Sequence, residues 1–422
     1  MNTGAAEGPH PSRNGGRTAA PGADPGDRTA HGPQPVGPGG GDTVPPGANP
    51  GGRVTHGPRP FVRGCAGGSG AVDGPGGGGD SLDRAGSVRP RAGEGSRAGG
   101  GGVGVGVLAV DSGGSGVRVV VADVHGDVLA RCESSEPVRT AARGIDAGHL
   151  MEQLVPMVRV LLADGGVTEL RAAAVGAAGL ASLGDALRAE LPGALGREFG
   201  VSTVALAADA VTAYVGALGA RPGAVVAAGT GLIAVGTDLD RWHRADGWGH
   251  LLGDCGGGAW IGRAGLEAAV RAHDGRPGGS AALLACAEEQ FGPVAGLPGQ
   301  LYPRPDRAAV LASFAPHVAA CSDDDPVAAD ILRAAARHMA ESAAAVCPTT
   351  GEPRVALTGG LFKTGAPLLV PLQEELAQRL PHAALVPSAG DPLTGSVRIA
   401  DDLAAGTLPL PRDEAMLYVT AS

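Results

Sequence analysis

The sequence predicts a mixed α/β protein built as two successive halves, each with its own sheet and covering helices. Apolar runs of strand length alternate with helix-length segments from about residue 104 onward. The strand–turn–strand pattern of the first half starts again near residue 225, and three glycine-rich turns each follow an apolar strand. Because such alternation is typical of sheets whose faces are covered by helices, we expect two α/β lobes.

The first half opens with three predicted strands joined by tight turns. The apolar run 105–110 ends at Asp111, a glycine-rich turn follows, and the segment VRVVVADV returns. A run that is apolar at every position predicts a strand buried on both faces. The elements predicted next are a helix over 146–163, a strand over 171–178, a helix over 182–199, a strand over 203–208 and a short helix after Asp209.

The second half repeats this order. The segment VVAAGTGLIAVG at 225–236 predicts a strand, a Gly-Thr-Gly turn and a returning strand. An Ala-rich helical insertion is expected over 264–346, and it is the candidate surface for a homodimer. The last predicted elements are a strand over 354–357 before the third glycine-rich turn, a helix over 365–379 and a helix over 395–405.

The first hundred residues differ from the rest in composition. They contain 29 Gly and 14 Pro but only nine of Ile, Val, Leu, Met, Phe, Tyr and Trp together. A segment with so few apolar side chains cannot bury enough surface to offset the entropy lost on ordering. We therefore expect residues 1–103 to be a disordered low-complexity tail.

Charge and cysteine spacing exclude several classes of protein. The formal net charge is −10. The first hundred residues have a net charge of +2, so the remaining residues are strongly acidic. Nucleic-acid binding needs clustered basic charge. Apolar runs stay well short of the roughly 20 residues that span a bilayer. With no signal segment at the start, we expect a cytoplasmic protein without nucleic-acid or membrane partners. The six cysteines show no C-x-x-C spacing, which argues against a disulfide framework or a zinc site.

The glycine-rich turns have a common physical use. Successive backbone N–H groups converge on a concave site for phosphate oxygens, and glycine lets the backbone come close. A carboxylate at the end of the first strand, Asp111, could hold Mg²⁺ through water beside those phosphates. Two such turns facing each other would clamp the phosphates of a nucleotide, with the third turn beside the rest of it. The pattern therefore predicts two lobes that close on ATP.

Five segments together carry a family resemblance. In chain order they are AVDSGGSG, AADAVTA, AAGTGLIAVG, GWGHLLGDCGGGAWIG and ALTGGLF. Over roughly residues 104–411 this order resembles the N-acetylglucosamine kinase family, which belongs to the superfamily of actin, sugar kinases and heat-shock ATPases. The family shares a domain type with the ATPases that activate benzoyl-CoA reductase and hydroxyacyl-CoA dehydratases. The most specific of the five segments is GWGHLLGDCGGGAWIG.

The resemblance implies two actin-like (ribonuclease H-like) lobes with an ATP cleft between them. The first would be 104–219, completed by a C-terminal helix at about 395–411, and the second would be 220–394 with the helical insertion. It implies an ATP-dependent phosphotransferase that uses Mg²⁺ and a small-molecule sugar. The ATP-binding residues would be Asp111, Ser112, Gly113, Gly114, Ser115, Gly116, Gly229, Thr230, Gly231, Gly359 and Gly360, with Asp111 also organising the metal. Asp209 would be the catalytic base, and Asp209, Gly253 and Asp254 would contact the sugar.

Simpler readings of the same residues stay open. Asp209 follows a strand and precedes a helix, so it could serve only as a helix N-cap. Asp254 could be a turn or cap residue. We expect Trp248 and Trp260 to pack in the core or at a hinge and His250 to be structural.

Departures from the family pattern leave the acceptor open. The usual sugar-contacting Asn is missing from 132–139, Cys255-Gly256-Gly257 replaces Glu-Gly-Ser after Asp254, and Leu232 stands where Ser is common. N-acetylglucosamine, a related amino sugar and another acceptor all remain candidates.

One alternative function is a reductase-activating ATPase, which would need cysteines placed for an iron–sulfur cluster. No obvious pair of cysteines is visible, and a special role for Cys255 stays open. The other alternative is a sugar-binding regulator that has lost catalysis.

Overall fold

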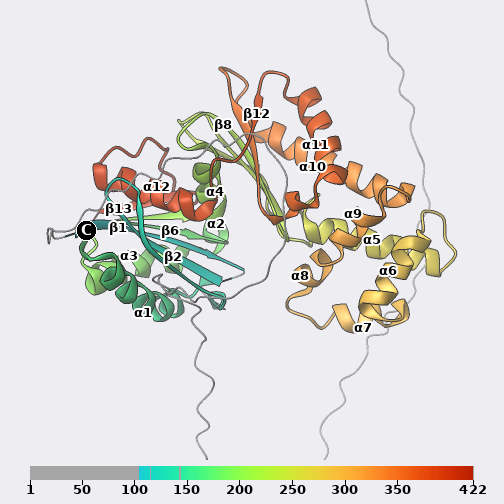
Figure 1. Cartoon of the computed structure of the whole chain (residues 1–422), viewed down its shortest axis with the longest axis horizontal. Helices are drawn as coiled ribbons and strands as arrows, with labels where there is room; N and C mark the ends of the chain where they lie inside the picture. Colours follow the sequence, from blue (N-terminus) through green and yellow to red (C-terminus); the bar gives the residue numbers. More distant parts are fainter. Residues whose placement is uncertain (1–103, 115, 142–143, 422) are drawn as a thin grey trace, which may run out of the picture. The chain divides into compact units, whose positions relative to one another are not determined.

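The computed structural model describes residues 104–114, 116–141 and 144–421. The predicted tail, 1–103, lies outside the described residues. Within the described part, the strands form two main sheets and one small two-stranded hairpin (Figure 1). The hairpin consists of β4 (Thr140–Ala141) and β5 (Gly144–Ile145).

The first sheet has the strand order β13-β7-β6-β1-β2-β3. Its strands are β1 (Gly104–Gly113), β2 (Gly116–Asp123), β3 (Val128–Ser134), β6 (Val167–Ala177), β7 (Thr203–Ala208) and β13 (Leu417–Ala421). β1, β6 and β7 run parallel, while β1–β2, β2–β3 and β13–β7 pair antiparallel. The three predicted opening strands are confirmed, but β13 was not predicted.

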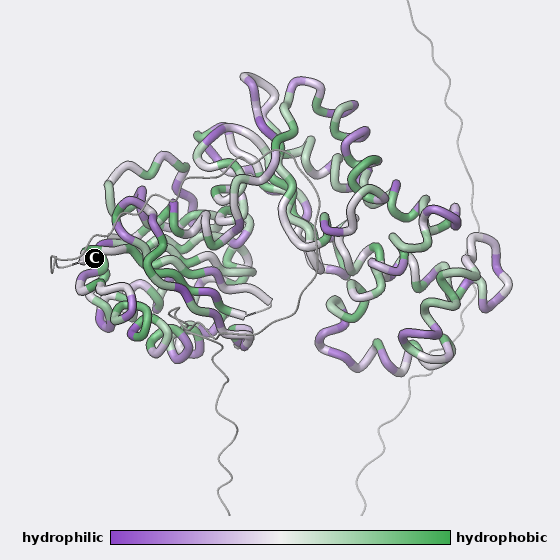
Figure 2. The backbone as a smooth tube through the Cα atoms, viewed as in Figure 1, coloured by the Kyte–Doolittle hydropathy of each residue, from purple (hydrophilic) through white to green (hydrophobic). Residues whose placement is uncertain are grey.

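Helices cover both faces of this sheet (Figure 1). They are α1 (Ala147–Gly165), α2 (Leu180–Leu183), α3 (Asp185–Phe199), α4 (Asp209–Leu218) and α12 (Pro392–Ala405). Leu108 and Val110 pack with residues of α1 and α3, whereas Val107 and Ala109 pack with residues of α4 and α12. The continuously apolar run in β1 is therefore buried on both sides, as predicted. Figure 2 shows the strands of this sheet as mainly hydrophobic.

Two predicted helix boundaries differ from the structure. The helix expected over 182–199 is divided at Gly184, where a Cβ would lie 2.2 Å from the carbonyl oxygen of Leu180. The C-terminal helix ends at Ala405, which agrees with the predicted span 395–405 but not with the end near 411 that the resemblance implied. It stops there because Gly406 adopts a left-handed backbone with φ of 70°, which suits glycine at a helix C-terminus.

The second sheet has the strand order β10-β9-β8-β11-β12. Its strands are β8 (Gly223–Ala228), β9 (Leu232–Thr237), β10 (Trp242–Asp246), β11 (Arg354–Thr358) and β12 (Ala384–Val386). The helices of this half are α5 (Gly258–His273), α6 (Ala281–Phe291), η1 (Val294–Gly296), α7 (Leu297–Leu301), α8 (Arg307–Ala312), α9 (Ala315–Cys321), α10 (Pro326–Val346), η2 (Gly360–Thr364) and α11 (Ala366–Arg379).

Small side chains let the helices of the insertion pack closely. Ala335, Ala336 and Ala340 of α10 are fully buried in the core of this half. A Cβ on Gly262 of α5 would lie 1.8 Å from the carbonyl oxygen of Leu311 in α8. The predicted Ala-rich, small-residue packing is thus present. None of the helices in the described ranges is both long enough and apolar enough to cross a membrane.

Candidate active site

A cavity of about 420 Å³ collects several of the predicted site residues. Segments of both sheets line it: the β7–α4 junction, the β8–β9 turn, and the loop after β10. The predicted residues that it brings together are Asp209, Gly229, Gly231, Asp254 and Gly359. The predicted residues outside its lining are Asp111, Ser112, Gly113, Gly114, Gly116, Thr230, Gly253 and Gly360. Ser115 lies outside the described residues.

Asp209 is the first residue of α4, directly after β7. Its Oδ1 accepts a hydrogen bond from the N–H of the adjacent Ala210 at 2.9 Å, and α4 has no side-chain cap. An N-cap side chain would instead accept from an N–H two or three residues further on. The geometry is therefore not that of a capping aspartate, although the helix N-terminus does favour a negative charge.

Burial changes the acidity of Asp209. Loss of solvent raises the pKa of its carboxyl from 3.8 to about 6; the Ala210 N–H opposes this rise and the charge of Asp111 adds to it. A general base works best when its pKa lies near the operating pH, because it is then both deprotonated and basic enough. Asp209 thus has the environment of a proton acceptor.

The β7–α4 junction is also hydrogen-bonded to the end of the chain. The N–H of Ala208 donates to the carbonyl of Met416 at 2.9 Å, just before β13 begins. Ala208 and Met416 both line the cavity next to Asp209. The position of Asp209 therefore depends on β13 as well as on β7.

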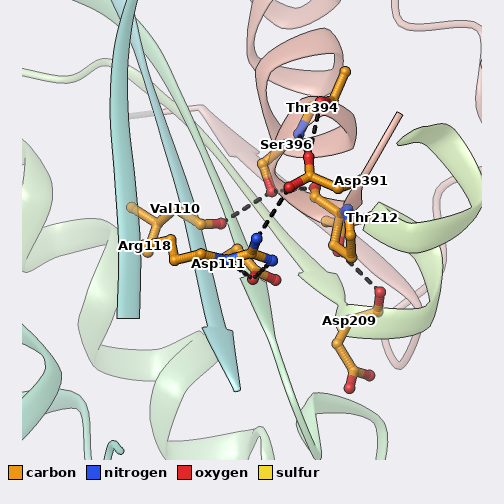
Figure 3. A network of polar contacts seen from close by, with 9 residues as sticks. Val110, Asp111, Arg118, Asp209, Thr212, Asp391, Thr394 and Ser396 are labelled. Carbon is orange, nitrogen blue, oxygen red and sulfur yellow. Dashed lines mark hydrogen bonds and ion pairs between the residues drawn. The ribbon is translucent and has the colours of Figure 1, made fainter. Parts of the chain in front are cut away.

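Asp111 forms an ion pair that the sequence analysis missed. It lies opposite Arg118 in the β1–β2 register, and Arg118 donates to its Oδ2 from Nε at 3.0 Å and from Nη2 at 2.5 Å (Figure 3). The third guanidinium nitrogen, Nη1, donates to Oδ2 of Asp391 at 3.0 Å. In Figure 3 the carboxylate of Asp209 points away from this group.

The ion pairs join the β1–β2 hairpin to α12. Asp391 caps that helix by accepting from the backbone N–H of Thr394 at 2.8 Å. Burial opposes the shift, but the hydrogen bonds from Thr394 and then the charge of Arg118 lower the pKa of the Asp391 carboxyl. A second link runs from the Ser396 hydroxyl to the carbonyl of Val110 at 3.0 Å. Asp111 is therefore fixed in place from both sides of the strand end.

The carboxylates fit Mg²⁺ only together with a nucleotide. Asp111 and Asp209 are near enough for their charges to interact. Nowhere in the described ranges do three or more His, Cys, Asp or Glu side chains gather as a metal site. Mg²⁺ normally combines one or two carboxylates with water and substrate phosphates, so this donor set is suited to a metal that arrives with ATP.

The second glycine-rich turn is held by the start of α5. Gly258 and Ala259 donate their N–H groups to the carbonyls of Gly229 and Thr230, at 2.9 and 2.8 Å. The N–H groups of Thr230 and Gly231 have no hydrogen-bond acceptor within the described part of the chain. Free N–H groups on a turn whose carbonyls are already bonded are typical of a phosphate-binding loop.

Asp246 organises the loop that carries Asp254, and the sequence analysis did not identify it. Its two carboxylate oxygens accept the N–H groups of Asp254 at 2.6 Å and Cys255 at 2.8 Å. Asp246 and Asp254 both have positive φ, 60° and 55°. A Cβ on Gly253 would lie 2.3 Å from Oδ1 of Asp246, so glycine there serves loop packing.

Asp254 is half-buried beside the second turn. Burial raises the pKa of its carboxyl; the N–H of Gly249, which donates to Oδ1 at 2.9 Å, opposes the rise. A Cβ on Gly231 would lie 2.4 Å from its Oδ2. The absence of a side chain at Gly231 therefore lets Asp254 approach the turn.

One cation in the cavity was also missed. Arg244 lines the same cavity as Asp209 and Asp254, with its guanidinium carbon 4.4 Å from the ring centroid of Trp248. Trp248 is 65% exposed, so it does not pack in the core, and a place at a hinge stays a prediction for it. Trp260 packs against the core and lies edge-on to His338, as expected. Nε2 of His250 is buried without a partner in the described residues.

A second cavity, of about 510 Å³, adjoins the third glycine-rich turn. Gly360, Lys363 and Thr364 line it together with residues of α9. Gly359 lines the first cavity and Gly360 the second. A Cβ on Gly359 would lie 2.1 Å from the carbonyl oxygen of Ala228, so this turn requires glycine to approach β8. The third turn thus borders both cavities.

Two cysteines meet within the helical insertion. The Sγ atoms of Cys286 in α6 and Cys321 in α9 are 3.8 Å apart, so the expectation of isolated cysteines was wrong for this pair. Burial raises the pKa of Cys321 to about 11, with a further contribution from Cys286. Burial also raises the pKa of Cys255. The thiols of Cys321 and Cys255 are therefore held in the protonated form.

Comparison with known proteins agrees with the fold described above. The sequence profile of the BadF/BadG/BcrA/BcrD ATPase family matches residues 108–395. A putative N-acetylglucosamine kinase from Chromobacterium violaceum is 26% identical, with 69% of this chain and 97% of that chain covered and a TM-score of 0.54. A putative N-acetylglucosamine kinase from Porphyromonas gingivalis, 18% identical with 69% and 97% coverage and a TM-score of 0.52, shows the same fold. The predicted fold class is confirmed.

A curated relative matches over a shorter stretch. An N-acetylmuramic acid/N-acetylglucosamine kinase from Clostridium acetobutylicum is 41% identical over 69 residues, which is 16% of this chain and 22% of that protein. The chain thus aligns with about a fifth of the length of this relative.

Proposed function

Because the chain belongs to the BadF/BadG/BcrA/BcrD ATPase family, we propose that it is an ATP-dependent kinase that phosphorylates a hydroxyl of N-acetylglucosamine or a related amino sugar. The observation that carries this proposal is the buried carboxylate of Asp209, whose pKa is raised to about 6. It shares one cavity with the second glycine-rich turn. A proton acceptor beside a phosphate site is what transfer to a hydroxyl requires.

In this proposal each sheet with its helices is one lobe, and ATP binds in the cleft. The adenosine would occupy the cavity beside Gly360 and Lys363, and the phosphates would reach the first cavity past Gly359. The proposed first lobe is 104–219 together with the returning α12 and β13, and the second is about 220–394. Mg²⁺ beside Asp111 would neutralise charge on the transferred phosphoryl group.

The chain's own residues would carry the remaining steps. Asp209 accepts the proton of the sugar hydroxyl as that oxygen bonds to the γ-phosphorus, while the bond from this phosphorus to the bridging oxygen breaks and ADP leaves. The N–H groups of Thr230 and Gly231 donate to phosphate oxygens, and the guanidinium of Arg244 lies in the same cavity to balance the negative charge. Positioning and charge neutralisation are the main protein contributions to phosphoryl transfer.

Asp254 is proposed as the ligand of a sugar hydroxyl. It lies with Asp209 in the first cavity, and Asp246 fixes its backbone. The similar proteins named above support an amino sugar as acceptor, since two are described as N-acetylglucosamine kinases and one as an N-acetylmuramic acid/N-acetylglucosamine kinase. A homodimer through the helical insertion stays a prediction.

The proximity of Cys286 and Cys321 is the observation that bears on the reductase-activator alternative. Such an ATPase shares an iron–sulfur cluster between two subunits, and the Cys286–Cys321 pair supplies two thiols per chain. Cluster ligands must be thiolates, whereas burial, followed by the hydrogen bond with Cys286, raises the pKa of the Cys321 thiol to about 11. Protein purified without oxygen is therefore expected to lack iron and visible absorption; one cluster per two chains would favour the activator.

The direct test is a panel of sugars incubated with the protein and Mg-ATP, with ADP release as the readout. N-acetylglucosamine, N-acetylmuramic acid, glucosamine and glucose would be compared at equal concentration. We expect ADP release to depend on an added N-acetylated amino sugar. ATP hydrolysis at the same rate without any sugar would contradict the kinase and favour an ATPase, and no turnover with any sugar would favour the regulator.

A further inference from the structure

A third cavity, of about 380 Å³, lies where the chain passes between the two sheets. The chain leaves α4 for β8 through residues 219–222 and returns from β12 to α12 through 387–391. Both passages contribute to the lining, the first with Gly219 to Arg221 and the second with Pro387 and Ala389. They also contact each other, since the N–H of Ala389 donates to the carbonyl of Ala217 at 3.0 Å.

Positive charge dominates this cavity. Three arginines, Arg221, Arg354 and Arg398, are its charged lining residues. In the ranges that the structure describes, none of the three lies within ion-pair distance of a carboxylate. Outside this cavity, eleven of the described arginines are ion-paired with a carboxylate and seven are not, so the distinguishing feature is that three unpaired arginines line one cavity together.

The three arginines come from different elements. Arg354 begins β11, Arg221 lies between α4 and β8, and Arg398 lies in α12. Arg398 already donates through Nη1 to the carbonyls of Val215 and Gly216, at 2.9 and 3.2 Å, near the end of α4. The Asp402 carboxyl feels the charge of Arg398 but is not part of the lining.

We propose that this cavity binds a phosphate dianion, either as inorganic phosphate or as the phosphate group of a small phosphomonoester. Guanidinium groups match the geometry of phosphate oxygens and form charge-assisted hydrogen bonds with them. A cavity of about 380 Å³ lies within the size range of small-molecule sites. The site differs from the candidate active site, with which it shares no lining residue.

Binding there would act on the helix that carries the candidate base. α4 begins at Asp209 in the first cavity and ends at Leu218 in the third. An anion held by arginines of three elements would fix the two passages of the chain, and through them the movement of one sheet relative to the other. The phosphate dianion is therefore expected to regulate the proposed ATP-dependent reaction from a distance.

Calorimetric titration of the full chain with inorganic phosphate tests the binding directly, with Mg-ADP present to occupy the nucleotide site. Arg221→Gln with Arg354→Gln is the test variant, because both side chains are exposed and neither has a hydrogen bond to lose; Arg398 is left intact because it bonds to α4. Arg333→Gln, on the exposed face of α10, is the matched control. We expect phosphate affinity to fall by about tenfold or more in the test variant only.

The outcomes separate clearly. Equal phosphate affinity in the wild type, the control and the test variant would overturn the proposal, and so would the absence of any binding to the wild type at millimolar phosphate. Repeating the titration with a sugar phosphate distinguishes the two sources: tighter binding than phosphate indicates a phosphomonoester. Thermal unfolding with and without phosphate provides a second measurement, since the test variant should lose the phosphate-induced rise in Tm. Neither the phosphate affinity nor the change in Tm depends on kinase activity. A failure of the phosphate-site proposal can therefore be told apart from a failure of the proposed function.

Discussion

Asp111 and Arg118 face each other across the β1–β2 hairpin, and two nitrogens of the Arg118 guanidinium donate to a single oxygen of the Asp111 carboxylate. The glycine-rich turn that joins their strands lies just beyond them. This ion pair links the two strand ends through Oδ2 of Asp111 and leaves its Oδ1 without a hydrogen-bond partner in the described residues. Asp391 extends the contact to α12.

Asp209→Asn should abolish most transfer to the sugar while nucleotide binding is retained. The substitution keeps the size of the side chain but removes the proton acceptor, an effect typically of order 10²–10⁴ in rate. The measurement is ADP release with the sugar that the panel selects, alongside nucleotide affinity by fluorescence. Near-normal turnover in well-folded protein would remove Asp209 from the mechanism.

The same carboxyl should make stability depend on pH. The folded-state pKa of Asp209 is raised to about 6, so folding favours its protonated form. Its favourable contribution is therefore complete below the unfolded pKa of about 4 and is lost as the pH rises through 6. At pH 7 the ionised group costs on the order of 3 kcal/mol, so Asp209→Asn should raise Tm at pH 7 and have little effect at pH 4. Equal Tm differences at both pH values would contradict the raised pKa.

Activity should show the opposite pH dependence. A general base must be deprotonated, so kcat should rise as the pH increases through about 6 and then level off. The profile of kcat against pH, measured at saturating ATP and sugar, checks this. A Glu136→Gln variant is a suitable control because that carboxylate lies outside both cavities. A flat profile between pH 5 and 7 would exclude Asp209 as the group that limits the reaction.

Asp111→Asn should weaken the use of Mg-ATP. The change removes the negative charge beside the phosphates and also leaves Arg118 with one anionic partner, Asp391, in place of two. We expect KM for Mg-ATP to rise about tenfold or more, while KM for the sugar changes less. Asp123→Asn, at the other end of β2, is the matched control. Unchanged Mg-ATP kinetics would make the Asp111–Arg118 pair purely structural.

Asp246→Ala should affect the sugar rather than the nucleotide. Without its carboxylate, the N–H groups of Asp254 and Cys255 lose their acceptors, and the loop that holds Asp254 loosens. We expect KM for the sugar to rise by about ten- to a hundredfold, since two hydrogen bonds to a charged acceptor are lost. Asp246→Asn, which keeps one carbonyl oxygen, should give a smaller increase. A change confined to KM for ATP would contradict the proposed role of this loop.

Much of the fold could be predicted because most strands are long apolar runs closed by glycine. β10 and β13 were missed for different reasons. The sequence of β10, WHRAD, is short and polar and contains no apolar run. The sequence of β13, LYVTA, pairs with β7, from which it is far removed along the chain. The division of the helix at Gly184 depends on a close contact that no periodicity reveals.

The candidate site was predictable where it depends on local pattern. The register of a tight hairpin places residues 111 and 118 opposite each other, so the ion pair could have been predicted from the turn. Asp246 could not, because its role depends on two N–H groups eight and nine residues away that a positive-φ loop turns toward it. Cys286 and Cys321 are 35 positions apart and meet only through the packing of α6 and α9.

The hydrogen bond between Ala208 and Met416 has a practical consequence for work with the recombinant protein. The residue before Asp209 is bonded to the segment that leads into β13, and β13 is the edge strand of its sheet. A purification tag fused directly after β13 would add chain to this edge strand and compete with its pairing to β7. Kinetic constants should therefore be measured on protein whose tag is placed ahead of the folded part or has been cleaved.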